Sequence, residues 1–324
     1  MISTQYNPSG YRNLLRMSHH KRLLVEGKDD KQLFKLLLDE FYNCNQDINN
    51  KVSIDSAESL IGFEQAIGNR EKVEIICQSV KNTPYSSKLV GFVDREFREF
   101  EFGINIQDNL TTHKVEDRLV WSRGHSVENY FFDFSILRDP LRDLSATECF
   151  DEALTLLARV IESAIRLACA ASLTGKEFGK LKLIKNSVSW KLLEVNHSEI
   201  TLVLDSWKQY LVEDQHLPLR DAQELINRYQ YWYKKIETAD IHLIKWICHG
   251  HIGIAFIWAA YSRCVYNVCP RGGQRKPEAE VASVQGIREG NRFHACASWW
   301  ARKAMRNQCD YPIEVLKLLG LTLP

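Results

Sequence analysis

Acidic side chains follow three short, largely apolar segments near the start of the chain. The segments cover residues 22–25, 89–93 and 119–121, and each has the character of a buried strand. The acids that follow them are Glu26, Asp30, Asp94, Glu96 and Glu128. An open α/β sheet places its ligand site just beyond the carboxyl ends of its strands. These acids are therefore candidates for a single site.

Carboxylates gathered from separate strands repel one another unless a cation lies between them. Hard oxygen ligands with little His or Cys nearby favour Mg²⁺, or Mn²⁺, over zinc. Such an ion polarises a phosphate oxygen and activates water, so the pattern predicts phosphodiester chemistry. Lys28 and Arg95, which lie among the acids in the sequence, are the candidate phosphate-binding residues there. We find no Ser-His-Asp or Cys-His pattern that would indicate acyl transfer.

Ordinary structural roles remain open for some of these acids. Asp30 has the position of a helix-capping or first-turn acid, which helices favour for dipole reasons alone. Glu96 fits a solvated loop, and Glu128 fits the start of a helix. Glu26 differs, because an acid directly after a Leu-Leu-Val strand is costly to bury without a partner or a metal.

The elements around these acids alternate between strand and helix patterns. Strands are predicted at 22–25, 52–54, 89–93 and 119–121, and helices at 29–41 and 72–80. This alternation is typical of an α/β domain with a mostly parallel, Rossmann-like sheet. We assign it to residues 1–140.

The second half of the chain has helical patterns and few strand candidates. The predicted helices cover 152–173, 200–212, 219–236 and 239–263, which gives an α-helical domain over residues 141–324. The aromatic-rich stretch 219–263 has more apolar surface than a small helical domain readily buries. It therefore predicts a homodimer formed through this half.

Composition limits the class of protein. The 324 residues have 42 Lys and Arg against 41 Asp and Glu, so the net charge of +1 gives no whole-protein argument for nucleic acid. Nine cysteines without a Cys-x-x-Cys pair indicate reduced thiols. The longest uncharged run, 246–262, falls short of a bilayer span and predicts a buried helix. We expect a cytoplasmic protein that does not enter a membrane.

One local surface could still bind nucleic acid. Residues 271–306 contain eight Lys or Arg against three acids, with tryptophans interleaved. This pattern suits a phosphate backbone with stacked bases, and Arg302, Lys303 and Arg306 are the candidate contacts. A solvated face with no ligand explains the charges equally well.

The first 135 residues resemble the Toprim domain of topoisomerases, bacterial primases and OLD-family nucleases. The resemblance rests on a strand, Glu26-Gly27, an acid that opens a helix, and a later strand that ends in Asp94-Arg95-Glu96. The Glu128-Asn129-Tyr130 element and the helical second half resemble a narrower branch, the Toprim effectors of the PARIS anti-phage defence system. The usual acid pair is Asp-x-Asp, so Glu96 is a departure. Its longer side chain can still reach a metal or a metal-bound water.

The resemblance implies roles for these residues and partners for the chain. Glu26 would be the catalytic glutamate, Asp94 and Glu96 the metal-binding pair, Asp30 a further ligand and Glu128 an additional acid. The chain would cleave tRNA after release from an ABC-type, AriA-like ATPase, which must supply any ATP dependence because the chain has no Walker A loop. Two other functions stay open: an OLD-like DNA nuclease, and a non-catalytic regulatory partner of an ATPase.

Overall fold

A five-stranded sheet organises the first part of the molecule, and its strand order is β2-β1-β3-β7-β6. The strands are β1 (Arg22–Val25), β2 (Ser53–Ser56), β3 (Leu89–Val93), β6 (Val115–Glu116) and β7 (Leu119–Trp121). β1 pairs in parallel with both β2 and β3, β3 pairs in parallel with β7, and β6 is the one antiparallel strand of this sheet. The predicted α/β domain with a mostly parallel sheet is therefore confirmed at this level.

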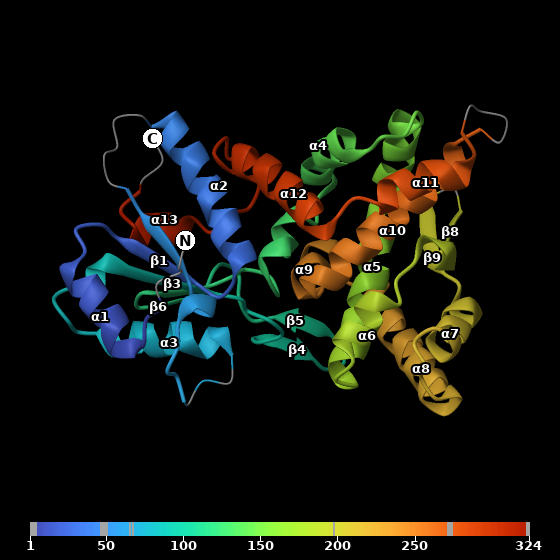
Figure 1. Ribbon diagram of the computed structural model, residues 1–324. Coiled ribbons are helices and arrows are strands. Elements are labelled where there is room, and N and C mark those ends of the chain that lie inside the picture. The colour runs from blue at the N-terminus through green and yellow to red at the C-terminus, as the bar shows by residue number, and fades with distance from the viewer. Residues whose placement is uncertain are drawn as a thin grey trace. The chain divides into compact units, whose positions relative to one another are not determined.

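The computed structural model in Figure 1 describes residues 5–45, 51–64, 66, 68–196, 198–270 and 275–321. It divides into two compact units. The first comprises residues 1–95, 110–130 and 297–324, and the second comprises residues 96–109 and 131–296.

Helices cover both faces of the sheet in the first unit (Figure 1). α1 (Pro8–Met17) and α3 (Asn69–Val80) pack on one face, where Tyr11, Leu15, Leu24 and Val73 share a buried core. α2 (Lys28–Cys44) packs on the other face and buries apolar residues at helical spacing. There the ring of Phe34 meets that of Phe92 edge-on, with centroids 4.8 Å apart. The short helices of this unit are η1 (Ala57–Ser59), η2 (Ser86–Lys88) and η3 (Val127–Phe131), of which η3 ends at the first residue of the second unit.

The C-terminal segment belongs to the first unit, which corrects the predicted domain division at residue 140. α13 (Ile313–Leu318) lies near β3, and the carbonyl of Leu318 accepts hydrogen bonds from Lys21 Nζ at 3.4 Å and from Arg118 Nη2 at 3.1 Å. The segment buries Leu316 and Leu321. This helix was not predicted from the sequence, and the packing shows which core it completes.

The second unit is mostly helical. Its helices are α4 (Phe134–Leu144), α5 (Phe150–Glu177), α6 (Leu181–Asn186), η4 (Trp190–Leu192), α7 (Leu204–Glu213), α8 (Leu219–Ile236), α9 (Ile241–Ile247), α10 (Gly250–Val268) and α11 (Pro277–Gln285). Its strands form two hairpins, β4 (Phe100–Phe102) with β5 (Ile106–Asp108), and β8 (Leu193–Asn196) with β9 (Glu199–Leu202). The chain passes from this unit to the first within α12 (Glu289–Ala304). α5 and α10 pack against each other at its centre.

Two predicted helices differ from the structure. The first turn predicted for 200–212 is strand β9, whose Ile200 pairs with Val195 of β8 across a hairpin. The helix predicted over 239–263 breaks at Cys248 and His249, which both have non-helical backbone angles, and the chain bends there by 118° between α9 and α10. The apolar pattern continues through the break because both helices pack into the same core, so periodicity alone does not reveal it.

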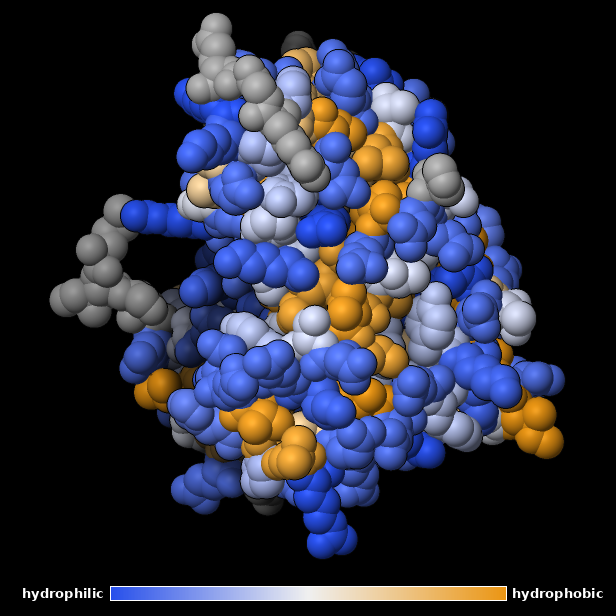
Figure 2. Space-filling view, turned by 90° about the vertical axis from the view of Figure 1, so that its right-hand side faces the viewer, coloured by the Kyte–Doolittle hydropathy of each residue, from blue (hydrophilic) through white to orange (hydrophobic). Residues whose placement is uncertain are grey.

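No single helix in the described part of the chain is long and apolar enough to cross a membrane, although α9 and α10 meet the length and composition test as a bent pair. In the structure α10 is a core helix, and most of its residues are buried. Figure 2 shows one face of the molecule, where hydrophilic side chains predominate and apolar ones form a central band and a few separate smaller patches. Within 219–263 the large exposed hydrophobic residues are Leu219 and Tyr231. Few large hydrophobic side chains of this stretch are therefore strongly exposed, and the homodimer stays a prediction.

Candidate active site at the carboxyl edge of the sheet

The strand order creates a topological switch point between β1 and β3. From β1 the chain passes through α2 to β2 on one side, and from β2 it passes through α3 to β3 on the opposite side of β1. Connections that leave in opposite directions open a crevice at the carboxyl ends of the two central strands, where α/β proteins bind ligands. Glu26 and Asp94 are the residues that directly follow these two strands.

Glu26 and Asp94 are in direct contact. The backbone N–H of Asp94 donates a hydrogen bond to Oε1 of Glu26 at 2.7 Å. The contact follows from the register, since Leu24 of β1 lies opposite Gly91 of β3 and the two strands end side by side. Both side chains are partly exposed. The structure therefore brings together the two acids on which the predicted site most depends.

A further acid, Asp30, lies close enough to both Glu26 and Glu128 to interact with them electrostatically. Burial is the main cause that raises the pKa of Asp30 to about 8, and the negative charges of Glu26 and Glu128 raise it further. The backbone N–H of Gly27 opposes the rise by donating to Oδ2 of Asp30 at 2.9 Å. Asp30 thus caps α2, which is the structural role that its position in the sequence suggested. It also belongs to a set of acids, Glu26, Asp30, Asp94 and Glu128, which we call the acidic group.

Glu128 is held inside a short loop that follows β7. Its side chain is 5% exposed, and its Oε2 accepts a hydrogen bond from the hydroxyl of Ser126 at 2.6 Å. The amide oxygen of Asn129 accepts the backbone N–H of Ser126 at 2.8 Å, which fixes the same turn. Glu128 lies in the 3₁₀ helix η3, so its interpretation as a helix-start residue is also correct in part.

Arg70 supports the backbone of Asp94, and sequence reasoning missed it. The guanidinium of Arg70 donates to the carbonyl of Asp94, its Nε donates to Glu74 at 2.7 Å, and it stacks 4.7 Å from the ring of Trp121. Arg70 is 4% exposed. One signal was available: Arg70 lies in the first turn of α3, where the helix dipole disfavours a cation. A basic residue at such a position indicates a specific partner.

The structure buries Arg95, one of the predicted nucleic-acid contacts. Its side chain is fully buried, and its Nη1 donates to the carbonyl of Arg123 at 3.0 Å. Its backbone N–H donates to Ser122 Oγ at 2.8 Å, and that hydroxyl donates to the carbonyl of Gly124 at 2.6 Å. Arg95 therefore ties the end of β3 to the loop that follows β7, and this is a positioning role.

Glu96 and Lys28 are placed differently from the buried acids. Glu96 has a positive φ of 56°, its side chain is 53% exposed, and it forms an ion pair with Arg98 at 3.8 Å. This agrees with the loop interpretation and does not make Glu96 a member of the acidic group. Lys28 is exposed at the first position of α2, so it remains available to a phosphate.

The predicted basic contacts lie at the C-terminal end of α12, in the first unit: Arg302 and Lys303 belong to its last turn, and Arg306 follows the helix. Arg302 and Arg306 are exposed and Lys303 is partly exposed. Arg302 lies 5.0 Å from the ring of Trp299 and 3.5 Å from a carboxylate oxygen of Glu40. Arg271, the first basic residue of the 271–306 stretch, lies outside the described residues.

No protein-family model matches the chain, and no curated protein matches it. The fold and the arrangement of the acids therefore have to carry the functional argument.

The chemistry of the acidic group fits a hard divalent cation. Carboxylate oxygens are the ligands that Mg²⁺ prefers. Burial is the main cause of the raised pKa of Asp30, and the smaller contribution from the charges of Glu26 and Glu128 is one that a cation would relieve. Among the described residues, however, no group of three or more His, Cys, Asp or Glu side chains is placed to hold a metal ion. Mg²⁺ commonly binds through one or two carboxylates and keeps several waters. Glu26 and Asp94 fit that mode of binding.

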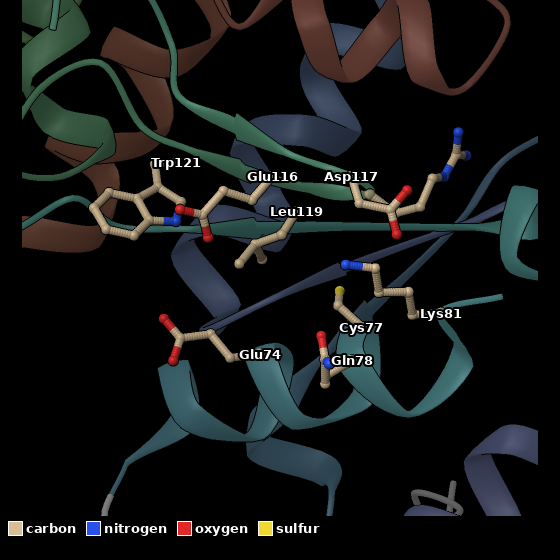
Figure 3. Close-up of a pocket in the computed structure, with 9 residues that line it drawn as sticks. Glu74, Cys77, Gln78, Lys81, Glu116, Asp117, Leu119 and Trp121 are labelled. Atoms are coloured by element: carbon tan, nitrogen blue, oxygen red, sulfur yellow. The ribbon is translucent and has the colours of Figure 1, made fainter.

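A cavity of about 570 Å³ lies elsewhere in the first unit, between α3 and the β6–β7 hairpin (Figure 3). Glu74, Cys77 and Lys81 line it from the helix, and Glu116 and Asp117 line it from the hairpin. None of the predicted site residues lines it. Its charges are of both signs, so it does not extend the acidic site.

The raised pKa of Asp30 makes a prediction about stability. In the unfolded chain an aspartate loses its proton near pH 3.9, whereas the folded protein holds it to about pH 8. Stability due to this group is therefore complete below pH 4 and is lost as the pH rises from 4 to 8. We expect Asp30→Asn in EDTA to match the wild type at pH 4. At pH 8 it should be more stable by at least about 1.4 kcal/mol, the equivalent of one pKa unit.

Urea unfolding of the two proteins across this pH range measures the effect. Asp29→Asn is the matched control, because it neutralises the adjacent acid in the same helical turn, where a negative charge favours the helix. It should be slightly less stable than the wild type. An Asp30→Asn protein that is less stable at pH 8 than the wild type would contradict the assignment of a strained buried acid.

Proposed function

We propose that the chain is a metal-dependent nuclease of the Toprim type. The observation that carries the proposal is the direct contact of Glu26 with the backbone of Asp94 at the switch point of the sheet, beside Asp30 and Glu128. Four carboxyl groups at one ligand-binding edge suit the handling of a cation and a phosphodiester better than any other chemistry that the sequence suggests.

Each residue of the site has a separate proposed role. Glu26 and Asp94 would hold Mg²⁺, which supplies charge stabilisation at a phosphate oxygen when it is bound. Arg70 fixes the backbone of Asp94, and Arg95 fixes the loop that presents Glu128. Asp30 keeps its proton at neutral pH because its pKa is about 8, so it is the group in the site that can release a proton near the working pH.

The narrower proposal concerns substrate and partners, and it rests on the resemblance to the PARIS effectors. We propose an AriB-like protein that an AriA-like ABC-type ATPase holds inactive, and that cleaves tRNA as a homodimer once released. An exposed Lys28 beside the acids and the exposed cations of α12 support a nucleic-acid substrate. They do not distinguish RNA from DNA, so an OLD-like DNA nuclease stays an alternative.

One observation favours a different function, that of a non-catalytic partner of an ATPase. No three potential metal ligands within the described ranges are placed around a common point. In this alternative the acids are structural, and Glu26 serves only to hold the start of the loop after β3.

Cleavage assays separate these functions. The purified chain is incubated with labelled tRNA and with labelled duplex DNA, each with Mg²⁺ and with EDTA, alone and in complex with its ATPase partner. We expect tRNA cleavage that requires Mg²⁺ and is suppressed in the complex. DNA cleavage alone would support the OLD-like alternative, and no cleavage of either substrate by the free chain would support the regulatory one.

The basic surface of α12 gives a second prediction. Replacing Arg302, Lys303 and Arg306 together by glutamine should weaken tRNA binding and flatten its salt dependence. Each lost phosphate contact removes about 0.7–0.9 from the slope of log affinity against log salt. Filter-binding assays at several salt concentrations measure the affinity for tRNA. Both proteins carry Glu26→Gln in these assays, so that the tRNA is not cleaved.

A control variant replaces three exposed arginines and lysines of the second unit, namely Arg138, Arg220 and Lys234, by glutamine. It removes the same total charge, so it should leave the slope nearly unchanged. If both variants lower the slope equally, α12 is a solvated face and contributes only to the general charge of the protein.

A further inference from the structure

Two cysteines that are far apart in the sequence bring their sulfur atoms unusually close. The Sγ atoms of Cys149 and Cys269 lie 2.7 Å apart, although 120 positions separate the residues. A disulfide bond is about 2.05 Å long. All nine cysteines fall within the described residues and none is in a disulfide, so this pair consists of two thiols almost in bonding position.

Ordered helix ends hold both residues in place. Cys149 is the N-cap of α5, where its carbonyl accepts the N–H of Ala153 at 3.0 Å, and its own N–H donates to Thr147 Oγ1 at 3.3 Å. Cys269 is the C-cap of α10, and its N–H donates to the carbonyl of Val265 at 3.0 Å. α5 and α10 are the central packed pair of the second unit. Bonding the two sulfurs therefore requires no repacking of the helices.

The pair is reachable by a small oxidant. Cys149 is partly exposed, whereas Cys269 is 5% exposed. A cavity of about 480 Å³ is lined by Cys269 together with Tyr266, Asn267, Lys276 and Glu278. Burial, and then the neighbouring Cys149, raise the pKa of the Cys269 thiol to about 12. Cys149 does not line this cavity but is the more exposed of the two, so it is the sulfur that meets an oxidant from solvent first, and Cys269 is the resolving partner.

We propose that Cys149 and Cys269 are an oxidation site, at which a hydroperoxide converts the two thiols to an intramolecular disulfide that joins the start of α5 to the end of α10. The Cys149 thiolate attacks a peroxide oxygen, which breaks the O–O bond and leaves a sulfenic acid and one water or alcohol. The Cys269 sulfur then attacks the Cys149 sulfur and displaces hydroxide, which leaves as water with the thiol proton. With hydrogen peroxide, two thiols and one peroxide give one disulfide and two waters. The linkage closes a long loop, so it stabilises the second unit chiefly by restricting the unfolded chain.

The test uses the full-length chain, reduced, freed of reductant and then treated with hydrogen peroxide. After alkylation of remaining thiols, non-reducing digestion and mass spectrometry should give one linked peptide pair that contains Cys149 and Cys269 and disappears with dithiothreitol. The count of titratable thiols should fall by two. The Tm of the oxidised protein should exceed that of the reduced protein by roughly 5–10 °C.

Serine variants test whether these two cysteines cause the linkage and the rise in Tm. Cys149→Ser and Cys269→Ser should each abolish the linked peptide and the rise in Tm, whereas Cys44→Ser, which removes an exposed cysteine, should keep both. The peptide map of the wild-type protein decides the question even if a variant fails to fold. Absence of the Cys149–Cys269 peptide after peroxide treatment, or pairing of either residue with another cysteine or another chain, overturns the proposal.

Discussion

Replacing Glu26 by glutamine is expected to lower the rate of the proposed tRNA cleavage by at least about 10²–10³-fold, the loss that removal of one key charge-stabilising group typically causes. Glutamine has nearly the same volume, and its amide oxygen can still accept the N–H of Asp94 that Glu26 Oε1 accepts at 2.7 Å. The substitution therefore removes the negative charge that a cation requires while it preserves the local structure. Single-turnover cleavage with Mg²⁺, beside thermal unfolding of the same sample, measures both quantities.

Two further variants sharpen this test. Asp94→Asn should cause a similar loss, because Asp94 follows the neighbouring strand at the same switch point. Glu96→Gln is the matched control: its side chain is 53% exposed and paired with Arg98, so its loss should be much smaller. A Glu26→Gln protein that keeps full Mg²⁺-dependent cleavage would show that the active site lies elsewhere. Equal losses for all three variants would show that Glu96 joins the metal site on substrate binding.

Replacing Gly253 by alanine should destabilise the protein by about 1–3 kcal/mol, the usual cost of overpacking a core. The sign is opposite to the general rule, since alanine within a helix is normally more favourable than glycine by about 0.5–1 kcal/mol. A Cβ atom at Gly253 would overlap the ring of Phe132, which is 3% exposed and enclosed by the core of the second unit. Chemical denaturation measures the loss in the free energy of unfolding, and we expect the m-value to stay unchanged.

Gly290→Ala provides the comparison for Gly253→Ala. Gly290 lies in the exposed first turn of α12, and a Cβ there would meet no described atom within 4 Å. This variant should be as stable as the wild type or more stable by up to about 1 kcal/mol. If Gly253→Ala is stabilising to the same degree, Phe132 has space to move and the packing of α10 is looser than the structure indicates.

Local sequence patterns were sufficient for the elements that carry the candidate site. The run Leu89–Val93 and the segment Arg22–Val25 are strands with the predicted bounds, and the helical spacing after Asp29 predicts α2. A parallel sheet is buried on both faces, so its strands are continuous apolar runs that end sharply at the first polar residue. That rule placed Glu26 and Asp94 at strand ends, and adjacent parallel strands then bring the two acids together.

Charged residues with the same local sequence pattern differ in burial in the structure. Arg95 and Lys28 both follow a predicted strand among acids, yet Arg95 is fully buried against the loop after β7 and Lys28 is exposed. Glu96 lies two residues after Asp94, but a positive φ and an ion pair place its side chain in solvent. Whether a charge is buried depends on which distant carbonyls can satisfy it, and no short window of sequence contains that information.

The sequence by itself predicted the four parallel strands of the sheet, the helices α2, α3, α5 and α8, and the acids at the strand ends, because backbone periodicity and side-chain polarity act over a few residues. It did not predict β6 or the two hairpins of the second unit, whose strands have only two to four residues each. Tertiary structure alone decided that Arg70 supports Asp94, that the segment from Ala297 onward completes the first unit, and that the sulfurs of Cys149 and Cys269 meet across 120 positions. These contacts join residues that are distant in the chain. They form only where the packing of entire helices and strands leaves one arrangement that fills the core and satisfies its buried polar groups.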